Sequence, residues 1–353
     1  MNNKLLTISI PTYNRESYLE VCLQKIKQSF LKLSDSDRSL ITIFISDNSD
    51  NNDSMILVHS GILDGIDFIY YKNENNIGSD QNLGNCYTKP KSHYIMLIGD
   101  DDYVEDHFFD MTLPLLKLEK YDIIFLKHYG LTNNKSQYRT NQKEVRVVNF
   151  KDVVSLLYHR NIAITFISSM IFRRSRYSDE EVNDGVGTHL VQVYLAFNII
   201  NKKGQFIYTP NILIGATRNN SGGYDPINIF LTNFFDLFKK FNNLGLSSVQ
   251  IFKLKKKILF IFYSRNFAQY IRNNNEPLNN YQIQILDNHF NESLIYRLFY
   301  RKLFLLSSLL SFYTLSLSYI FFNLFYYPDK IRDYFFHFLA FKKSMFISLF
   351  NSK

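Results

Sequence analysis

Three consecutive carboxylates, Asp100, Asp101 and Asp102, directly follow the apolar residues 94–98 and Gly99. Adjacent carboxylates repel one another, and burial beside a strand removes the water that would screen them. A hard divalent cation with oxygen ligands, Mg²⁺ or Mn²⁺, relieves that repulsion. Such a cation can also neutralise a departing diphosphate. The alternative interpretation is a solvated acidic turn that caps the following helix.

Two more polar groups follow apolar segments in the same way. Asp47 ends residues 41–46 and can accept hydrogen bonds from a nucleobase or a ribose, or form an Asx turn or helix cap. The segment IPTYNR occupies residues 10–15. In it, Tyr13 can stack on a base and Arg15 can pair with phosphate, unless this stretch only begins a helix.

These polar groups need a scaffold that brings them together. Short apolar segments alternate with helix-length segments, and we expect strands at residues 5–10, where Pro11 ends the strand, and at 41–46, 66–71, 94–98 and 121–126. This alternation predicts an α/β fold with a doubly wound, mostly parallel sheet. Ligands bind such sheets at the carboxyl ends of the strands. Because the polar groups lie at those ends, we expect a single site there.

The composition fits a well-packed cytoplasmic protein. The chain has 353 residues, of which 46% are hydrophobic and 20% charged, enough for one large domain or two ordinary ones. Its two cysteines form no spaced cluster, which excludes a disulfide framework or a cysteine zinc site. The first 15 residues do not match a secretory signal, so we expect the chain in the cytoplasm.

Charge and aromatic residues are distributed unevenly. Residues 1–110 hold 9 Lys and Arg against 17 Asp and Glu, whereas residues 226–353 hold 16 against 6 and carry 22 of the 33 phenylalanines. We therefore expect a catalytic domain over residues 1–225 and a basic, Phe-rich helical extension over 226–353. Helical patterns occupy residues 227–243, 248–272 and 279–300.

The extension contains two features that suggest a membrane. Residues 303–328 are uncharged but include several Ser and Thr, so a helix on a bilayer surface, a spanning helix and a buried helix all remain open. Lys253 and residues 255–257 place cations beside apolar side chains. Nucleic acid and an anionic membrane both attract such charge. Because no nucleic-acid-binding motif accompanies it, we expect a membrane surface and no nucleic acid.

Taken together, the motifs resemble the family-2 glycosyltransferases with a GT-A fold. The resemblance rests on ISIPTYNR at 8–15, IFISDNSD at 43–50, NENNIGSDQN at 73–82 and YIMLIGDDD at 94–102, and more weakly on FISSMIFRRSRY at 166–177 and INKKGQFIYTPNIL at 200–213. The combination of IPTYNR, SDN, NxGxDxN and GDDD is similar to abequosyltransferase-type enzymes of surface-polysaccharide synthesis.

The resemblance implies a role for each motif residue. The nucleotide pocket would be lined by Pro11, Thr12, Tyr13 and Arg15. Asp47 would contact a pyrimidine base, and Asp80 would lie near the base or the diphosphate. In the acidic triplet, Asp100 or Asp101 would face the ribose, and Asp102 with Asp100 would hold Mn²⁺ or Mg²⁺.

The catalytic base departs from the family pattern. Inverting members usually carry a Glu-Asp pair before a helix, but residues 185–197, GVGTHLVQVYLAF, contain no carboxylate. His189 lies where the pair is expected and can act as a general base near neutral pH. Asp184 and Glu181 are the nearby alternatives.

The implied reaction is metal-dependent, inverting transfer of a sugar from a nucleoside diphosphate sugar to a hydroxyl of a growing, lipid-linked surface glycan. The expected location is the inner face of a bacterial cell membrane. A nucleotidyltransferase would need a Gly-rich loop with Arg or Lys after the first strand, where this chain has IPTYNR. The remaining alternative is a non-catalytic member that binds a nucleotide sugar or scaffolds polysaccharide assembly.

Overall fold

The computed structural model describes residues 4–130, 144–150, 152–217, 227–241, 244–264, 266–268, 270, 276–306 and 309–326. The chain divides into two compact units. The first contains residues 1–156 and 163–245, and the second contains 157–162 and 246–353. The contacts thus group the residues up to Gly245 with the first unit, whereas the sequence suggests a division at residue 225. A catalytic domain joined to an extension stays a prediction.

The first unit is built on a sheet of eight strands in the order β3-β2-β1-β4-β7-β6-β8-β5. The strands are β1 (Leu6–Thr12), β2 (Ile41–Asp47), β3 (Phe68–Lys72), β4 (Tyr94–Leu97), β5 (Tyr103–Val104), β6 (Ile123–Gly130), β7 (Met170–Arg173) and β8 (Phe206–Ala216). The pairs β3-β2, β2-β1, β1-β4 and β6-β8 are parallel. β7 runs antiparallel to β4 and β6, as β5 does to β8. The mostly parallel α/β sheet is confirmed.

One detail of the first strand is wrong in the sequence prediction: Pro11 lies inside β1 and does not end it. Odd-numbered residues of β1 point their hydrogen-bonding groups at β4, since the carbonyl oxygens of Leu5 and Ser9 accept from that segment. β4 ends opposite Ser9, at Leu97. Pro11 therefore lies beyond the end of β4, where pairing requires no N–H from it.

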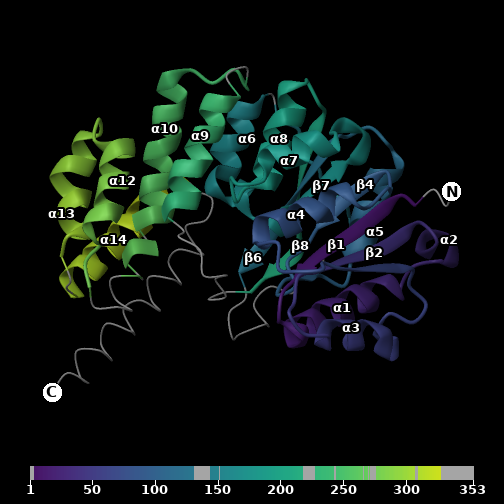
Figure 1. Ribbon diagram of the computed structural model, residues 1–353. Coiled ribbons are helices and arrows are strands. Elements are labelled where there is room, and N and C mark those ends of the chain that lie inside the picture. The colour runs from purple at the N-terminus through teal and green to yellow at the C-terminus, as the bar shows by residue number, and fades with distance from the viewer. Residues whose placement is uncertain are drawn as a thin grey trace. The chain divides into compact units, whose positions relative to one another are not determined.

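Helices cover both faces of the sheet in the first unit (Figure 1). α1 packs against α3 and α5 on one side, and α4 packs against α7 and α8 on the other. The helices are α1 (Glu16–Phe30), α2 (Asp35–Arg38), α3 (Asp53–Leu57), α4 (Ser79–Thr88), α5 (Phe108–Lys117), α6 (Val153–Arg160), α7 (Asp179–Gly185), α8 (Val191–Asn201) and α9 (Phe234–Lys240). The last residues of α6 belong to the second unit.

The main core lies between the sheet and α1. Apolar side chains recur along α1 at helical spacing, and those facing the sheet, including Leu19, Leu23 and Ile26, are fully buried. They meet the even-numbered side chains of β1, of which Ile8 and Ile10 have no exposed surface. This packing fixes α1, and with it the turn that joins β1 to α1.

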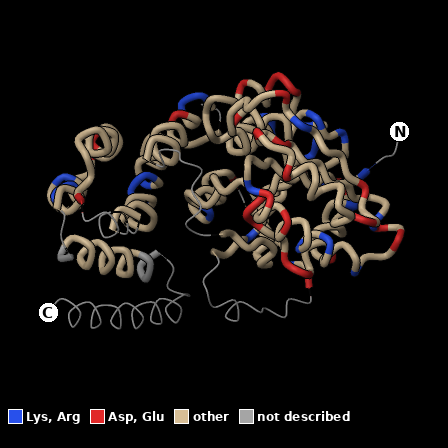
Figure 2. Tube along the Cα trace, turned by 60° about the horizontal axis from the view of Figure 1, so that its bottom comes forward, with Lys and Arg blue, Asp and Glu red and all other residues tan. Residues whose placement is uncertain are grey.

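The second unit is helical. It contains α10 (Ser248–Ile258), α12 (Asn280–Phe290), α13 (Arg301–Phe304) and α14 (Leu309–Tyr326), with π-helical turns at Leu259–Tyr263 and Tyr296–Tyr300. None of the helices within the described part of the chain is both long enough and apolar enough to cross a membrane. Acidic residues are concentrated in the first unit, and few occur on the helices of the second (Figure 2).

Candidate active site

The carboxyl ends of β1, β2 and β4 bring the predicted polar groups to one edge of the sheet. Thr12, the last residue of β1, lies in register with Asp47, the last residue of β2. On its other side, the Thr12 hydroxyl donates a hydrogen bond to Asp100 at 2.8 Å. Thr12 therefore connects the first predicted segment to the acidic triplet.

Arg15 provides the positive charge that faces the triplet. Its guanidinium pairs with Asp100 at 3.3 Å and with Asp101 at 3.0 Å. The same group lies over the ring of Tyr18, 4.9 Å from the centroid, one turn into α1. Because α1 begins directly after Arg15, the helix that packs on the core also aims this cation at the site.

Asp102 is held by two segments that lie far away in the sequence. Its Oδ2 accepts a hydrogen bond from the Ser168 hydroxyl at 2.6 Å, and its Oδ1 accepts one from the Thr217 backbone N–H at 3.1 Å. Ser168 also accepts from the Gly99 N–H at 3.0 Å. The Thr217 hydroxyl donates to the Asp101 carbonyl oxygen. The triplet is thus a folded loop with fixed side chains, which argues against a simply solvated turn.

Burial perturbs the protonation of this loop. Asp100 and Asp102 are each only 4% exposed. Burial raises the pKa of Asp100 to about 7, against the lowering effect of Arg15. Burial, together with repulsion from Asp101, raises the pKa of Asp102 to about 7. Near pH 7 both carboxyl groups are therefore partly protonated, because burial disfavours their charged form and the surrounding side chains do not fully compensate it.

A bound divalent cation would supply the positive charge that favours the ionised form of these buried carboxyl groups. The donor atoms are carboxylate oxygens, the ligands that Mg²⁺ and Mn²⁺ prefer, and Mg²⁺ needs only one or two of them alongside substrate phosphates. Among the described residues, no group of three or more His, Cys, Asp or Glu side chains is arranged to hold a metal ion. The chemistry of Asp100 and Asp102 thus fits a cation that is completed by a ligand, and not a closed structural site.

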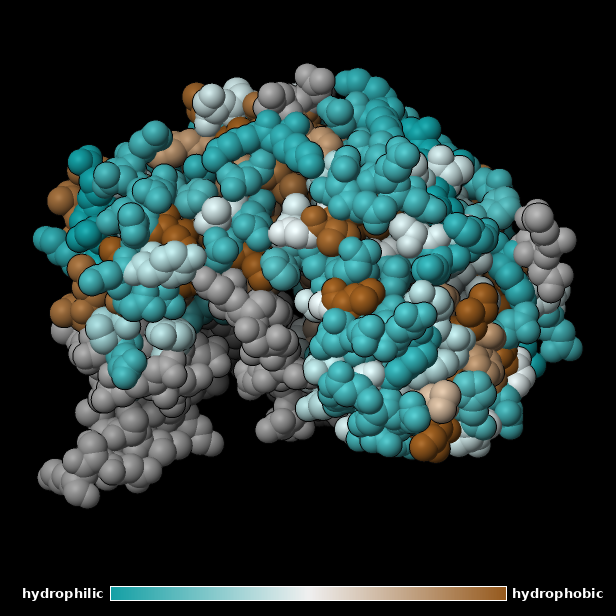
Figure 3. All heavy atoms as spheres, viewed as in Figure 1, coloured by the Kyte–Doolittle hydropathy of each residue, from teal (hydrophilic) through white to brown (hydrophobic). Residues whose placement is uncertain are grey.

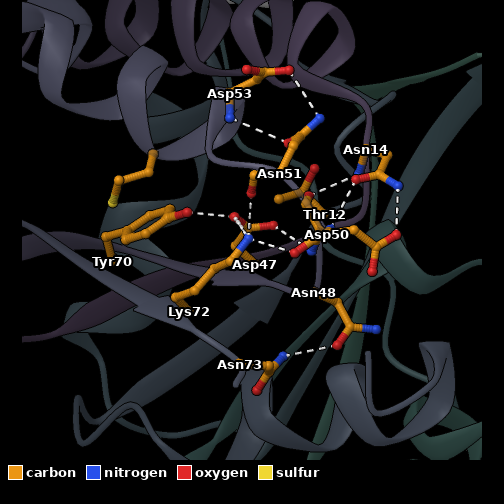
Figure 4. A network of polar contacts seen from close by, with 12 residues as sticks. Thr12, Asn14, Asp47, Asn48, Asp50, Asn51, Asp53, Tyr70, Lys72 and Asn73 are labelled. Carbon is orange, nitrogen blue, oxygen red and sulfur yellow. Dashed lines mark hydrogen bonds and ion pairs between the residues drawn. The ribbon is translucent and has the colours of Figure 1, made fainter. Parts of the chain in front are cut away.

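Asp47 lies at the centre of a polar network (Figure 4). It has no exposed surface. Its Oδ1 accepts from the Ser49 N–H at 2.8 Å, and its Oδ2 accepts from the Tyr70 hydroxyl and from the Lys72 ammonium, the latter at 3.1 Å. Every donor in this set comes from the protein, so a nucleobase would compete with them for the same carboxylate.

Tyr13 and Asn14 form a second, exposed part of the same network, of which Figure 4 shows Asn14 and Asp50. The Tyr13 hydroxyl donates to Asp50 at 2.9 Å, and the Asn14 amide donates to the same oxygen at 3.1 Å. The hydrogen bond to Asp50 raises the pKa of Tyr13. The bonds from Asn14 and Tyr13 together lower the pKa of Asp50. The Tyr13 ring is 42% exposed, as a platform for a planar ligand must be.

The NENNIGSDQN segment connects this edge to the segment that carries His189. Asn82 exchanges hydrogen bonds with Ser46, next to Asp47, at 2.7 and 3.0 Å. Two positions earlier, the Asp80 Oδ2 accepts from the backbone N–H groups of Gly187 and His189, the latter at 3.0 Å. Two of the predicted site residues, Asp80 and His189, are thus in direct contact.

Of the candidate bases, Glu181 and Asp184 lie in α7, and His189 lies in the segment between α7 and α8. His189 is exposed and has a left-handed backbone, with φ of +55°. Asp184 is also exposed and accepts a hydrogen bond from the Tyr194 hydroxyl at 3.5 Å. Glu181 instead completes the capping box of α7 and pairs with Lys202. The bond to Ser178 gives Glu181 a helix-capping role, and the ion pair with Lys202 holds the same carboxylate.

Several partners at this site were not predicted from the sequence. Ser168 and Thr217 bind Asp102, while Tyr70 and Lys72 bind Asp47. For Ser168, the only signal in the sequence is a pair of serines before the apolar strand β7. For Thr217, it is a threonine directly after the long strand β8. Neither signal indicates a partner 66 or 115 residues away.

Comparison with known proteins gives consistent matches. The family described as "Glycosyl transferase family 2" matches residues 7–180. Abequosyltransferase RfbV of Salmonella typhimurium is 26% identical over 223 residues, which cover 58% of this chain and 63% of RfbV. The match therefore spans less than two thirds of that relative.

Solved structures agree on the fold. S. aureus TarS 1-349 in complex with UDP-GlcNAc has a TM-score of 0.53 at 13% identity, covering 89% of this chain and 90% of that chain. S. aureus TarS itself has a TM-score of 0.55 at 13% identity, covering 89% of this chain and 55% of that chain.

Proposed function

The chain belongs to glycosyl transferase family 2 through residues 7–180, and from that premise we propose that it transfers a sugar from a nucleoside diphosphate sugar to a hydroxyl of a growing surface glycan. The family and the fold expected from the sequence motifs are confirmed. The observation that carries the proposal is the edge where Thr12, Arg15, Asp100 and Asp102 meet, because it joins phosphate-pairing and metal-binding chemistry.

In the proposed reaction, an acceptor hydroxyl attacks the anomeric carbon, and the bond from that carbon to the diphosphate oxygen breaks. The hydroxyl proton passes to a general base, for which His189 is the first candidate and Asp184 the second. Attack opposite the leaving group inverts the anomeric centre. An exposed imidazole on a fixed backbone suits this role, since it can meet an acceptor that arrives from solvent.

The donor would lie along the edge of the sheet. Tyr13 offers an exposed ring for the base, and Arg15 offers a guanidinium for phosphate. Asp102 and Asp100 would hold a divalent cation, which when bound neutralises charge on the diphosphate leaving group. Since Arg15 already pairs with Asp100 and Asp101, an arriving diphosphate would compete with these carboxylates for the guanidinium. The TarS neighbour holds UDP-GlcNAc, which supports a donor of this class.

We further propose that the second unit binds the cytoplasmic surface of the membrane, where a lipid-linked acceptor would be found. Six apolar residues within residues 294–306 are exposed, and the proposal treats them as one apolar face: Leu294, Ile295, Leu298, Phe299, Leu305 and Leu306. The exposed cations Arg297 and Lys302 lie beside it. Apolar side chains also reach the surface around α13 (Figure 3). Adjacent apolar and cationic groups on a strongly basic segment favour an anionic bilayer surface.

Thermal unfolding with a panel of nucleoside diphosphates and their sugars, each with and without Mn²⁺, tests the donor site. Binding to the folded state raises the midpoint. We expect one pyrimidine diphosphate to raise it only with Mn²⁺, and Asp102→Asn to abolish that increase. If the folded protein responds to no member of the panel, the donor site is refuted.

Vesicle sedimentation tests the membrane surface. We expect the full chain to sediment with vesicles containing phosphatidylglycerol and to bind pure phosphatidylcholine more weakly. Replacing Leu298 and Phe299 by Glu should release the protein, whereas Ile56→Glu, at an exposed position on α3 of the first unit, should not. Equal binding by the double variant and the wild type would show that this apolar face is not the docking surface.

A further inference from the structure

The contact between Asp80 and the loop that carries His189 has a use beyond donor binding. Asp80 is the second residue of α4 and is only 7% exposed. Its Oδ2 accepts from two backbone N–H groups of one loop, those of Gly187 and His189. A carboxylate oxygen shared by two alternate N–H groups fixes the backbone between them.

The loop needs such an anchor because its backbone is unusual. Gly187 has φ of +93°, which glycine adopts easily, but His189 has φ of +55°, which a residue with a Cβ adopts rarely. Such a conformation persists only where the surroundings hold it in place. Asn233 adds a second hold, since its side-chain amide donates to the Thr188 carbonyl oxygen at 2.8 Å.

The anchor fixes the backbone and leaves the imidazole free. Thr188 is partly buried and the apolar neighbour Leu190 is buried, but His189 is exposed. The second Asp80 oxygen, Oδ1, is buried and has no hydrogen-bond partner within the described parts of the chain. Neither is an ion pair of Asp80 present there. The two bonds that Oδ2 accepts from the loop are therefore the contacts that hold the Asp80 carboxylate in place.

We propose that Asp80 is a positioning residue that fixes the left-handed backbone at His189 and so sets where the imidazole meets the acceptor hydroxyl. This inference rests on the proposed function, in which His189 takes the proton. It joins the donor segment of residues 73–82 to the catalytic loop through one carboxylate. Displacement of a reacting group by about 1 Å can slow a reaction by about 100-fold.

The test compares Asp80→Ala, which removes the acceptor oxygen, with Asp80→Asn, which keeps one. We expect Asp80→Ala to lower kcat by about 100-fold with the KM for the donor unchanged, because orientation and not binding is lost. Asp80→Asn should retain most of the rate. Asp110→Ala, at an exposed position on α5, is the matched control and should change neither value.

Amide hydrogen exchange of the full chain gives a readout that does not depend on activity. In Asp80→Ala, the amides of Gly187 and His189 should exchange faster, and in Asp80→Asn they should stay protected. Unchanged exchange in Asp80→Ala, or a kcat that stays at the wild-type value, would overturn the proposal. So would a rise in the donor KM that accounts for the whole loss. Absence of transfer by the wild-type chain would refute the proposed function instead, while the exchange data would still decide whether Asp80 anchors the loop.

Discussion

Replacing Asp102 by Asn should stabilise the metal-free protein at alkaline pH. In the folded chain, burial and repulsion from Asp101 raise the pKa of Asp102 to about 7 from 3.8. A pKa shift of that size means that the ionised Asp102 destabilises the folded protein by at most about 4 kcal/mol. Part of this destabilisation is also shared with Asp100, which is repelled by Asp101 as well. In the Asn variant, the hydrogen bonds from Ser168 and Thr217 are weaker than those to a carboxylate, and this loss cancels about 1–2 kcal/mol of the gain. We therefore expect a net gain of about 2 kcal/mol at pH 8, or roughly 6 °C in the unfolding midpoint.

The gain should depend on pH with a definite sign. Between pH values of about 4 and 7, the folded chain keeps protons on Asp100 and Asp102 that the unfolded chain has lost. The free energy of unfolding of the wild type therefore falls as pH rises through this window. At pH 5, Asp102 is already neutral in the folded wild type, so the Asn variant should offer no advantage.

The assay is thermal unfolding in EDTA at pH 5 and pH 8, with Asp110→Asn as an exposed control on α5. The control should match the wild type at both pH values. At pH 8, Mn²⁺ should reduce the difference in unfolding midpoint between Asp102→Asn and the wild type, since the cation favours the ionised wild-type site. A variant that is less stable than the wild type at pH 8, or equally stabilised at both pH values, would refute the buried-charge account of the triplet.

Three further predictions concern other residues of the site. His189→Ala should retain nucleotide-sugar binding in the thermal assay and lose transfer by at least about 100-fold, the low end for a general base; full activity would remove His189 from the mechanism. Lys72→Met leaves the buried carboxylate of Asp47 without a cation, so urea unfolding should show a loss of about 3 kcal/mol. An unchanged urea midpoint would mean that neutral donors suffice. Arg15→Gln removes the cation beside Asp100, so nucleoside diphosphate affinity, measured by calorimetry, should fall by about 10-fold or more; unaltered affinity would exclude a phosphate contact.

The fold could be predicted where short apolar strands alternate with amphipathic helices. β1, β2, β3, β4 and β6 match the five predicted strands closely. β5, β7 and β8 were not predicted. β5 has only two residues and β7 only four, and both pair with partners distant in the sequence. β8 is long, but Pro210 interrupts its apolar run, and a proline argues against a strand in the interior of a sheet. Pro11 was misread as a strand end, because its tolerance depends on where the neighbouring strand stops, which the sequence does not show.

In the candidate site, too, the residues at strand ends could be predicted, whereas the contacts between distant segments could not. Motifs at strand ends indicated Thr12, Asp47 and the acidic triplet, since the carboxyl ends of parallel strands share one edge. The contact between Asp80 and His189 joins residues 109 apart through a side chain and a backbone amide. No periodicity encodes such a contact, and the left-handed φ at His189 follows only from the folded loop.

The most direct test of the central claim is product formation. The full chain would be incubated with a nucleotide sugar that binds in the thermal assay, Mn²⁺ and a panel of lipid-linked oligosaccharides, and the products separated by chromatography and weighed by mass spectrometry. The account predicts equal amounts of released nucleoside diphosphate and of an acceptor heavier by one sugar, both lost in Asp102→Asn. A nucleotide sugar that binds but is never consumed, with any acceptor or with water, would contradict it and identify a non-catalytic nucleotide-sugar-binding protein.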